Sequence, residues 1–117
     1  MLINNGNGTF QIISLPVEAQ FSTVYAICAE DFNNDNICDI LIGGNQSRAK
    51  PETGIYEASY GLYLKGNSKG TWESVSTEHS GFFTKGEIRD LKTLKINEQQ
   101  FVVVAKNNNH LQFFKNQ

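Results

Sequence analysis

The chain lacks the features that mark several protein classes. No apolar run approaches the roughly 20 residues of a membrane-spanning helix, so we expect no membrane span. The net charge is −2, and the excess of basic residues typical of nucleic-acid-binding domains is therefore missing. Two histidines and two cysteines among 117 residues do not supply the paired ligands of a zinc site.

Catalytic motifs are also missing. His79 and His110 stand in turn-like surroundings, and no serine has the Gly-x-Ser-x-Gly elbow of a nucleophile. Because side chains alternate along a strand, Glu87 and Asp90 would face opposite sides of it. We interpret them, with Arg89, as an ion-paired structural network. The sequence therefore predicts that the chain is not an enzyme.

The segment at residues 31–39 is the most informative feature present. It reads Asp-Phe-Asn-Asn-Asp-Asn-Ile-Cys-Asp, which places oxygen-bearing side chains at loop positions 1, 3, 5 and 9. Calcium takes six to eight oxygen ligands, and alternate residues of a curled loop can converge on one such ion. The expected ligands are the side chains of Asp31, Asn33 and Asp35, the carbonyl of Ile37, and Asp39.

Two other structures have loops of similar composition. An EF-hand would require a Gly at position 6 and a Glu at position 12, where this loop has Asn36 and Ile42. The short apolar runs at 24–29 and 40–44 predict strands, not helices, on either side. The remaining alternative is an Asn/Asp-rich turn that binds no ion.

Cys28 and Cys38 flank the loop. They could form a disulfide that staples it, or they could be two small buried hydrophobic residues. We favour free thiols, since unpaired cysteine is among the most buried residue types.

The chain also repeats itself at an offset of 62 residues. The matched segments are Phe21 with Phe83, residues 40–43 with 102–105, Asn45 with Asn107, and residues 8–10 with 70–72. A constant period of this size predicts stacked supersecondary units. The same offset places Thr93, Lys95, Asn97 and Phe101 at the positions of Asp31, Asn33, Asp35 and Asp39. Since these residues are poor ligands, we expect one Ca²⁺ per chain.

The pattern of short apolar segments predicts an all-β protein without helices. The candidate strands lie near residues 1–4, 9–15, 22–30, 37–43, 60–65, 70–76, 86–94, 99–105 and 111–115. Antiparallel four-stranded units at a fixed period are typical of β-propeller blades. We interpret residues 1–20 as the outer hairpin of a preceding blade, 21–77 as a blade with the calcium loop and an insertion at 46–60, and 83–117 as a blade without that loop.

Residues 31–43 resemble the FG-GAP, or VCBS, repeat of integrin-type β-propellers. Residues 50–61 and 86–90 are similar to the last blades of large Bacteroidetes VCBS proteins related to cartilage acidic protein and the ASPIC/UnbV group. The resemblance implies a propeller segment whose loop is stabilised by bound calcium and which makes extracellular or cell-surface contacts. Residues 1–6 lack the basic and apolar regions of an export signal, so we expect the signal of a secreted parent to lie upstream.

The predicted function is a non-catalytic calcium-binding module for adhesion, with a protein or a glycan as partner. Arg48, Tyr56 and Tyr60 of the insertion form the candidate recognition loop, although the tyrosines could instead anchor the loop to its own blade. The alternative function is an accessory fragment of a carbohydrate-active or lyase-like propeller enzyme. Since 117 residues cover fewer than two periods, we expect a partial propeller that belongs to a longer parent or closes by self-association.

Overall fold

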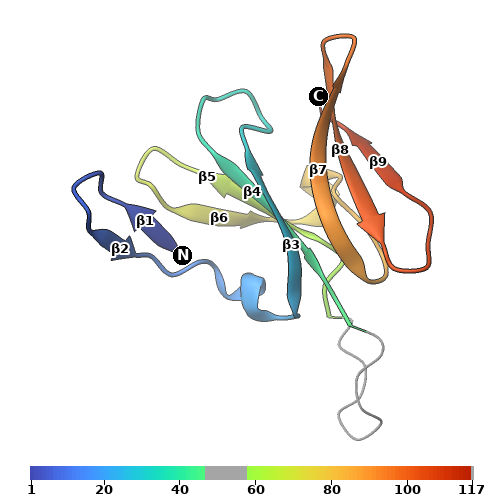
Figure 1. Cartoon of the computed structure of the whole chain (residues 1–117), viewed down its shortest axis with the longest axis horizontal. Helices are drawn as coiled ribbons and strands as arrows, with labels where there is room; N and C mark the ends of the chain where they lie inside the picture. Colours follow the sequence, from blue (N-terminus) through green and yellow to red (C-terminus); the bar gives the residue numbers. More distant parts are fainter. Residues whose placement is uncertain (47–57, 117) are drawn as a thin grey trace, which may run out of the picture.

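The computed structural model describes residues 1–46 and 58–116, and in them the chain is all-β (Figure 1). The strands are β1 (Leu2–Asn4), β2 (Phe10–Ile12), β3 (Val24–Glu30), β4 (Asp39–Gly44), β5 (Leu62–Gly66), β6 (Trp72–Val75), β7 (Ile88–Ile96), β8 (Gln99–Lys106) and β9 (Gln112–Lys115). Each overlaps one predicted segment. Two helical turns were not predicted, a 3₁₀ turn at Val17–Gln20 and α1 at Thr77–Ser80. Each has only four residues, too few for a helical periodicity to show in the sequence.

The strands form three antiparallel sheets that follow chain order. β1 pairs with β2, β3 to β6 form a four-stranded meander, and β7 to β9 form a three-stranded one. Figure 1 shows the sheets fanned out side by side. The described part of the chain does not close into a propeller, and it contains no helix long and apolar enough to cross a membrane.

Equivalent turns occur one sequence period apart. The Asn5 N–H donates to the Thr9 carbonyl at 3.0 Å, and Asn5 Nδ2 donates to Thr9 Oγ1 at 2.9 Å. Asn67 makes the same two bonds to Thr71, at 3.0 and 2.8 Å. The two turns predicted to be equivalent therefore have the same bonding.

The first hairpins of the two larger sheets, β3–β4 and β7–β8, share a register shift near the start of their first strand. The β3–β4 register shifts between Val24 and Ala26, and the β7–β8 register shifts between Ile88 and Asp90. Each hairpin is then closed by an asparagine N–H, from Asn45 to the Thr23 carbonyl at 3.2 Å and from Asn107 to the Glu87 carbonyl at 2.8 Å.

The far ends of these two hairpins differ. β7 and β8 meet in a tight turn whose two central residues have positive φ, 48° at Asn97 and 64° at Glu98. β3 and β4 instead open into residues 31–38.

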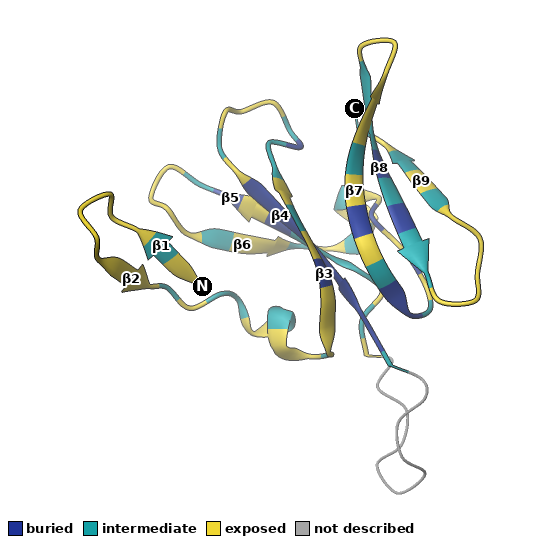
Figure 2. Cartoon of the chain, viewed as in Figure 1, coloured by how far each residue is buried: buried dark blue, intermediate teal, exposed yellow. Residues whose placement is uncertain are grey.

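Most of the core lies between these two sheets. Ala26 and Leu41, from β3 and β4, are buried in one cluster with Ile88, Leu91, Val102 and Val104. Figure 2 shows buried segments of β3 and β4 beside those of β7 and β8. Full burial of each large aliphatic side chain stabilises the fold by roughly 1.5–3 kcal/mol. Phe32 of the 31–38 loop belongs to the same cluster, so this packing holds the loop beside both sheets.

A second cluster covers the other face of the four-stranded sheet. Ile40, Ile42 and Leu64 are buried there against Leu15, Ala19 and Trp72. The segment before β3 therefore shields part of that face.

Candidate metal centre

The loop at residues 31–38 is organised around the carboxylate of Asp31. Asp31 Oδ1 accepts the N–H groups of Asn33 at 3.3 Å and Asp35 at 3.1 Å, and Oδ2 accepts that of Asn36 at 2.7 Å. The turn needs positive φ at two places, 60° at Asn34 and 62° at Asn36. Asparagine tolerates this conformation better than most side chains. Asn36 therefore permits the turn although it is not glycine.

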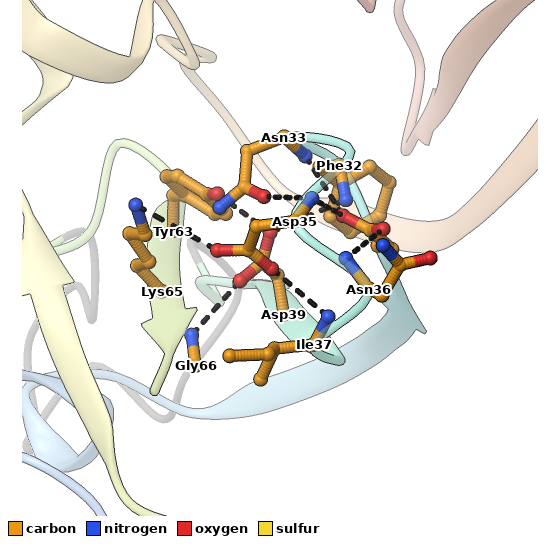
Figure 3. Close-up of polar contacts among 10 residues, drawn as sticks. Phe32, Asn33, Asp35, Asn36, Ile37, Asp39, Tyr63, Lys65 and Gly66 are labelled. Atoms are coloured by element: carbon orange, nitrogen blue, oxygen red, sulfur yellow. Dashed lines mark hydrogen bonds and ion pairs between the residues drawn. The ribbon is translucent and has the colours of Figure 1, made fainter. Parts of the chain in front are cut away.

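The next two predicted ligands continue the pattern. Asn33 Oδ1 accepts the Asp35 N–H, and Asp35 Oδ1 accepts the Ile37 N–H, both at 2.9 Å. These are Asx turns, in which a side chain bonds the backbone two residues further on. They leave Asp35 Oδ2 facing Lys65 Nζ at 3.8 Å (Figure 3). The loop thus gathers oxygen atoms at alternate positions, with one lysine ammonium group near them.

Asp39 is held differently, because it is fully buried at 0% exposure. Its Oδ2 accepts the Phe32 N–H at 3.2 Å and the Tyr63 hydroxyl at 2.7 Å, and its Oδ1 accepts the Gly66 N–H at 2.8 Å (Figure 3). Three donors stabilise the buried charge. Asp39 therefore fastens the start of the loop to β5, a role that its spacing in the sequence did not indicate.

Tyr63 is a site residue that the sequence analysis missed. Burial, followed by the hydrogen bond to Asp39 and its negative charge, raises the pKa of the Tyr63 hydroxyl well above its ordinary value of 10.0. The hydroxyl therefore remains a protonated donor at neutral pH. No local motif marks Tyr63, because its partner is 24 positions away in the sequence.

The two cysteines are free. The disulfide alternative is therefore wrong. The expected burial on strands is also wrong for Cys38, which is exposed and precedes β4, whereas Cys28 lies on β3 and is half-buried. Burial raises the pKa of both thiols, with a further contribution from Glu30 at Cys28 and from Asp39 at Cys38. Since a metal binds the thiolate, neither cysteine is a good ligand in this setting.

The loop offers hard oxygen donors, the type that calcium prefers. The side chains of Asp31, Asn33 and Asp35 lie on successive turns of the loop, and Asp39 Oδ1 keeps a lone pair beyond its bond to Gly66. In residues 1–46 and 58–116, no three His, Cys, Asp or Glu side chains are arranged to hold a metal ion. The structure therefore does not bring the three predicted carboxylate ligands, Asp31, Asp35 and Asp39, together as one metal-binding group.

The equivalent hairpin in the second large sheet carries other chemistry. In the strand registers, Phe101 of β8 lies opposite Leu94 of β7, just as Asp39 of β4 lies opposite Glu30 of β3. Phe101 therefore occupies the position equivalent to Asp39, as predicted. Thr93, however, occupies the place of Ala29 and not that of Asp31, because the 31–38 loop is two residues longer than its counterpart. The Thr93 hydroxyl instead donates to Glu30 across the sheets, at 2.5 Å.

The predicted network around Glu87 is present in part. Arg89 Nη2 lies 2.7 Å from Glu87 Oε2, and Asn107 Nδ2 donates to the same oxygen at 2.6 Å. Asp90 lies near Lys92 instead, at 3.8 Å. Side-chain alternation is interrupted by the register shift at Arg89, which the sequence pattern did not reveal.

The candidate recognition loop lies mostly outside the described residues. Arg48 and Tyr56 belong to that part of the chain. Tyr60 is described, and its half-exposed ring stacks on Phe83 with centroids 5.2 Å apart. Its carbonyl also accepts the Thr84 N–H at 2.9 Å. Tyr60 is thus fixed against the segment that leads into β7.

Comparison with known proteins gives no relatives. No protein-family model matches the chain, and neither the curated proteins nor the solved structures contain a significant match.

Proposed function

We propose that the chain is a non-catalytic calcium-binding module that makes contacts with a protein or a glycan. The observation that carries the proposal is the 31–38 loop, in which Asp31, Asn33 and Asp35 are each held by backbone N–H groups at alternate positions. Such side chains are oriented before an ion arrives, so binding requires little reorganisation.

Asp31, Asn33, Asp35, the Ile37 carbonyl and Asp39 would hold one Ca²⁺. When bound, the ion supplies positive charge to a loop whose carboxylates otherwise repel one another. The Lys65 ammonium group lies 3.8 Å from Asp35, and its side chain is half exposed. An exposed pair of this kind contributes little. Calcium would therefore stabilise the loop far more than Lys65 does.

The architecture proposed around this loop is a partial β-propeller of the FG-GAP type, in an extracellular or cell-surface protein. The two bulged hairpins and the two matching asparagine turns support a repeating unit. Other blades, supplied by a longer parent or by further copies of the chain, would complete the ring.

The first prediction concerns calcium binding by titration calorimetry. We expect one site per wild-type chain, together with a higher melting temperature in calcium than in chelator. Asp31→Asn should weaken binding by roughly tenfold or more, because it removes a charged ligand that also organises the loop backbone.

Glu98→Gln is the matched control, since it removes a carboxylate from the turn of the equivalent hairpin. It should leave calcium binding unchanged. Absence of both heat and a melting shift in the wild-type chain would contradict the proposal and favour an ion-free turn.

A further inference from the structure

A cleft of about 630 Å³ opens between the two large sheets. This volume lies in the range of about 300–1,000 Å³ found for small-molecule sites. Six separate segments line it, including Leu41 of β4 and Val102 of β8 at its base. The residues that the argument uses are Phe32 and Asn33 from the loop, Tyr63 from β5, His79 from α1, and Phe114 and Asn116 from β9 and its end. Residues far apart in the sequence therefore converge on one concave surface.

Aromatic rings form the apolar part of this cleft. Phe32 and Tyr63 meet edge to face with centroids 6.4 Å apart, and Phe114 packs against Phe82 at 4.9 Å. These contacts fix the rings in place, so a ligand would meet a preformed surface. A ligand that suits it has an apolar face.

The polar groups of the cleft include both donors and acceptors. Asn33 Nδ2 is buried beside the Tyr63 hydroxyl, where it makes no hydrogen bond of good geometry within the described residues. Figure 3 shows the amide end of Asn33 directed towards Tyr63. His79 Nδ1 pairs with Ser76 Oγ at 2.7 Å, which leaves Nε2 for another partner. Asn116 uses its Nδ2 on Gln100 at 3.0 Å and retains Oδ1.

The charges at the cleft balance, since Glu78 and Lys115 both line it. No single sign predominates to attract an ion. Hydroxyl groups both donate and accept hydrogen bonds, and a sugar ring adds an apolar face of C–H groups. A neutral sugar therefore matches the rings and the mixed polar rim together.

We infer that this cleft binds one neutral sugar residue of a glycan, and that the calcium loop forms one wall of the site. The inference rests on the proposed function and names its ligand. Phe32 and Asn33 belong both to the loop and to the cleft, and the Phe32 N–H is bonded to Asp39 at 3.2 Å. A cation that orders the loop also orders this wall, so calcium and sugar should strengthen each other's binding.

The second prediction tests this with the whole chain on an array of neutral glycans ending in hexoses or N-acetylhexosamines, in calcium and in chelator. The strongest ligand is then titrated by calorimetry. We expect saturable binding that is weaker in chelator. His79→Ala should weaken sugar binding by roughly tenfold while calcium binding is kept. His110→Ala, in an exposed turn outside the cleft, should change neither.

Each other outcome overturns part of the inference. Calcium binding without any glycan binding leaves the proposed function standing and rules out the sugar site. Glycan binding that His79→Ala does not alter places the site elsewhere, and glycan binding that is independent of calcium removes the link to the loop. If the chain binds extended peptides and not glycans, and His79→Ala loses that binding, the cleft is a peptide-binding site and the sugar site is ruled out.

Discussion

Asp39 is the residue on which the candidate site depends most. Its buried carboxylate joins the start of the loop, at Phe32, to two residues of β5, Tyr63 and Gly66. Removing one donor from a buried charge costs about 1–3 kcal/mol, because the charge loses part of its compensation. Asp39 therefore has a structural role whether or not it also binds calcium.

The third prediction concerns Tyr63→Phe. The variant should be less stable than wild type by about 1–3 kcal/mol at neutral pH, because Asp39 loses the hydroxyl donor. The raised pKa of Tyr63 makes this difference depend on pH. Above the ordinary pKa of 10.0, the unfolded tyrosine ionises while the folded one keeps its proton, so the wild type loses stability as pH rises.

The measurement is urea unfolding of both proteins at several pH values from neutral to about 11. The stability difference between them should shrink above the ordinary pKa of tyrosine. A constant difference across that range would show that the pKa of Tyr63 is not raised in the folded protein.

At the level of elements, the sequence predicted the order and approximate place of all nine strands of the described structure. The strand signals are local, since they depend on apolar runs bounded by Asn and Gly. The fixed offset also paired the asparagine turns correctly. It misplaced Thr93 because a constant offset cannot accommodate a loop that is two residues longer than its counterpart.

The site was predictable only where its chemistry is local. The spacing of Asp31, Asn33 and Asp35 predicted a tightly curled loop, and these side chains do bond to neighbours within it. Asp39 bonds to Tyr63 and Gly66 across the sheet. These two partners reach Asp39 because β5 pairs with β4, and the spacing of residues within 31–39 gives no information about that pairing.

The fourth prediction tests the packing of the two large sheets. A Cβ atom at Gly43 would lie 2.6 Å from Ile88 Cγ2, so β4 and β7 must separate to admit it. Gly43→Ala should therefore destabilise the protein by about 1–3 kcal/mol, as measured by urea unfolding. In an Ile88→Ala background the same change should cost less. Equal costs in both backgrounds would contradict this close approach.

At the scale of the whole molecule, apolar side chains remain exposed on all three sheets. Ile12 of β2 is 80% exposed, Ile27 of β3 63% and Phe113 of β9 54%. Large exposed apolar surfaces commonly mark sites of association. This exposure supports the proposal that further blades or further copies complete the structure.

The fifth prediction is therefore self-association of the isolated chain. Light scattering should give a mass well above the 13.1 kDa of one chain, rising with concentration. Ile27→Asp should reduce the association without altering the circular dichroism spectrum. A monomer at every concentration would count against a propeller ring built from several copies of this chain. The missing blades would then have to come from a longer parent protein.

The most direct test of calcium binding is a crystal structure of the chain grown in calcium. We expect one ion bound at residues 31–39, with oxygen ligands from Asp31, Asn33, Asp35, Asp39 and the Ile37 carbonyl at about 2.3–2.6 Å. A loop that keeps its internal hydrogen bonds around Asp31, with no ion at saturating calcium, would contradict it.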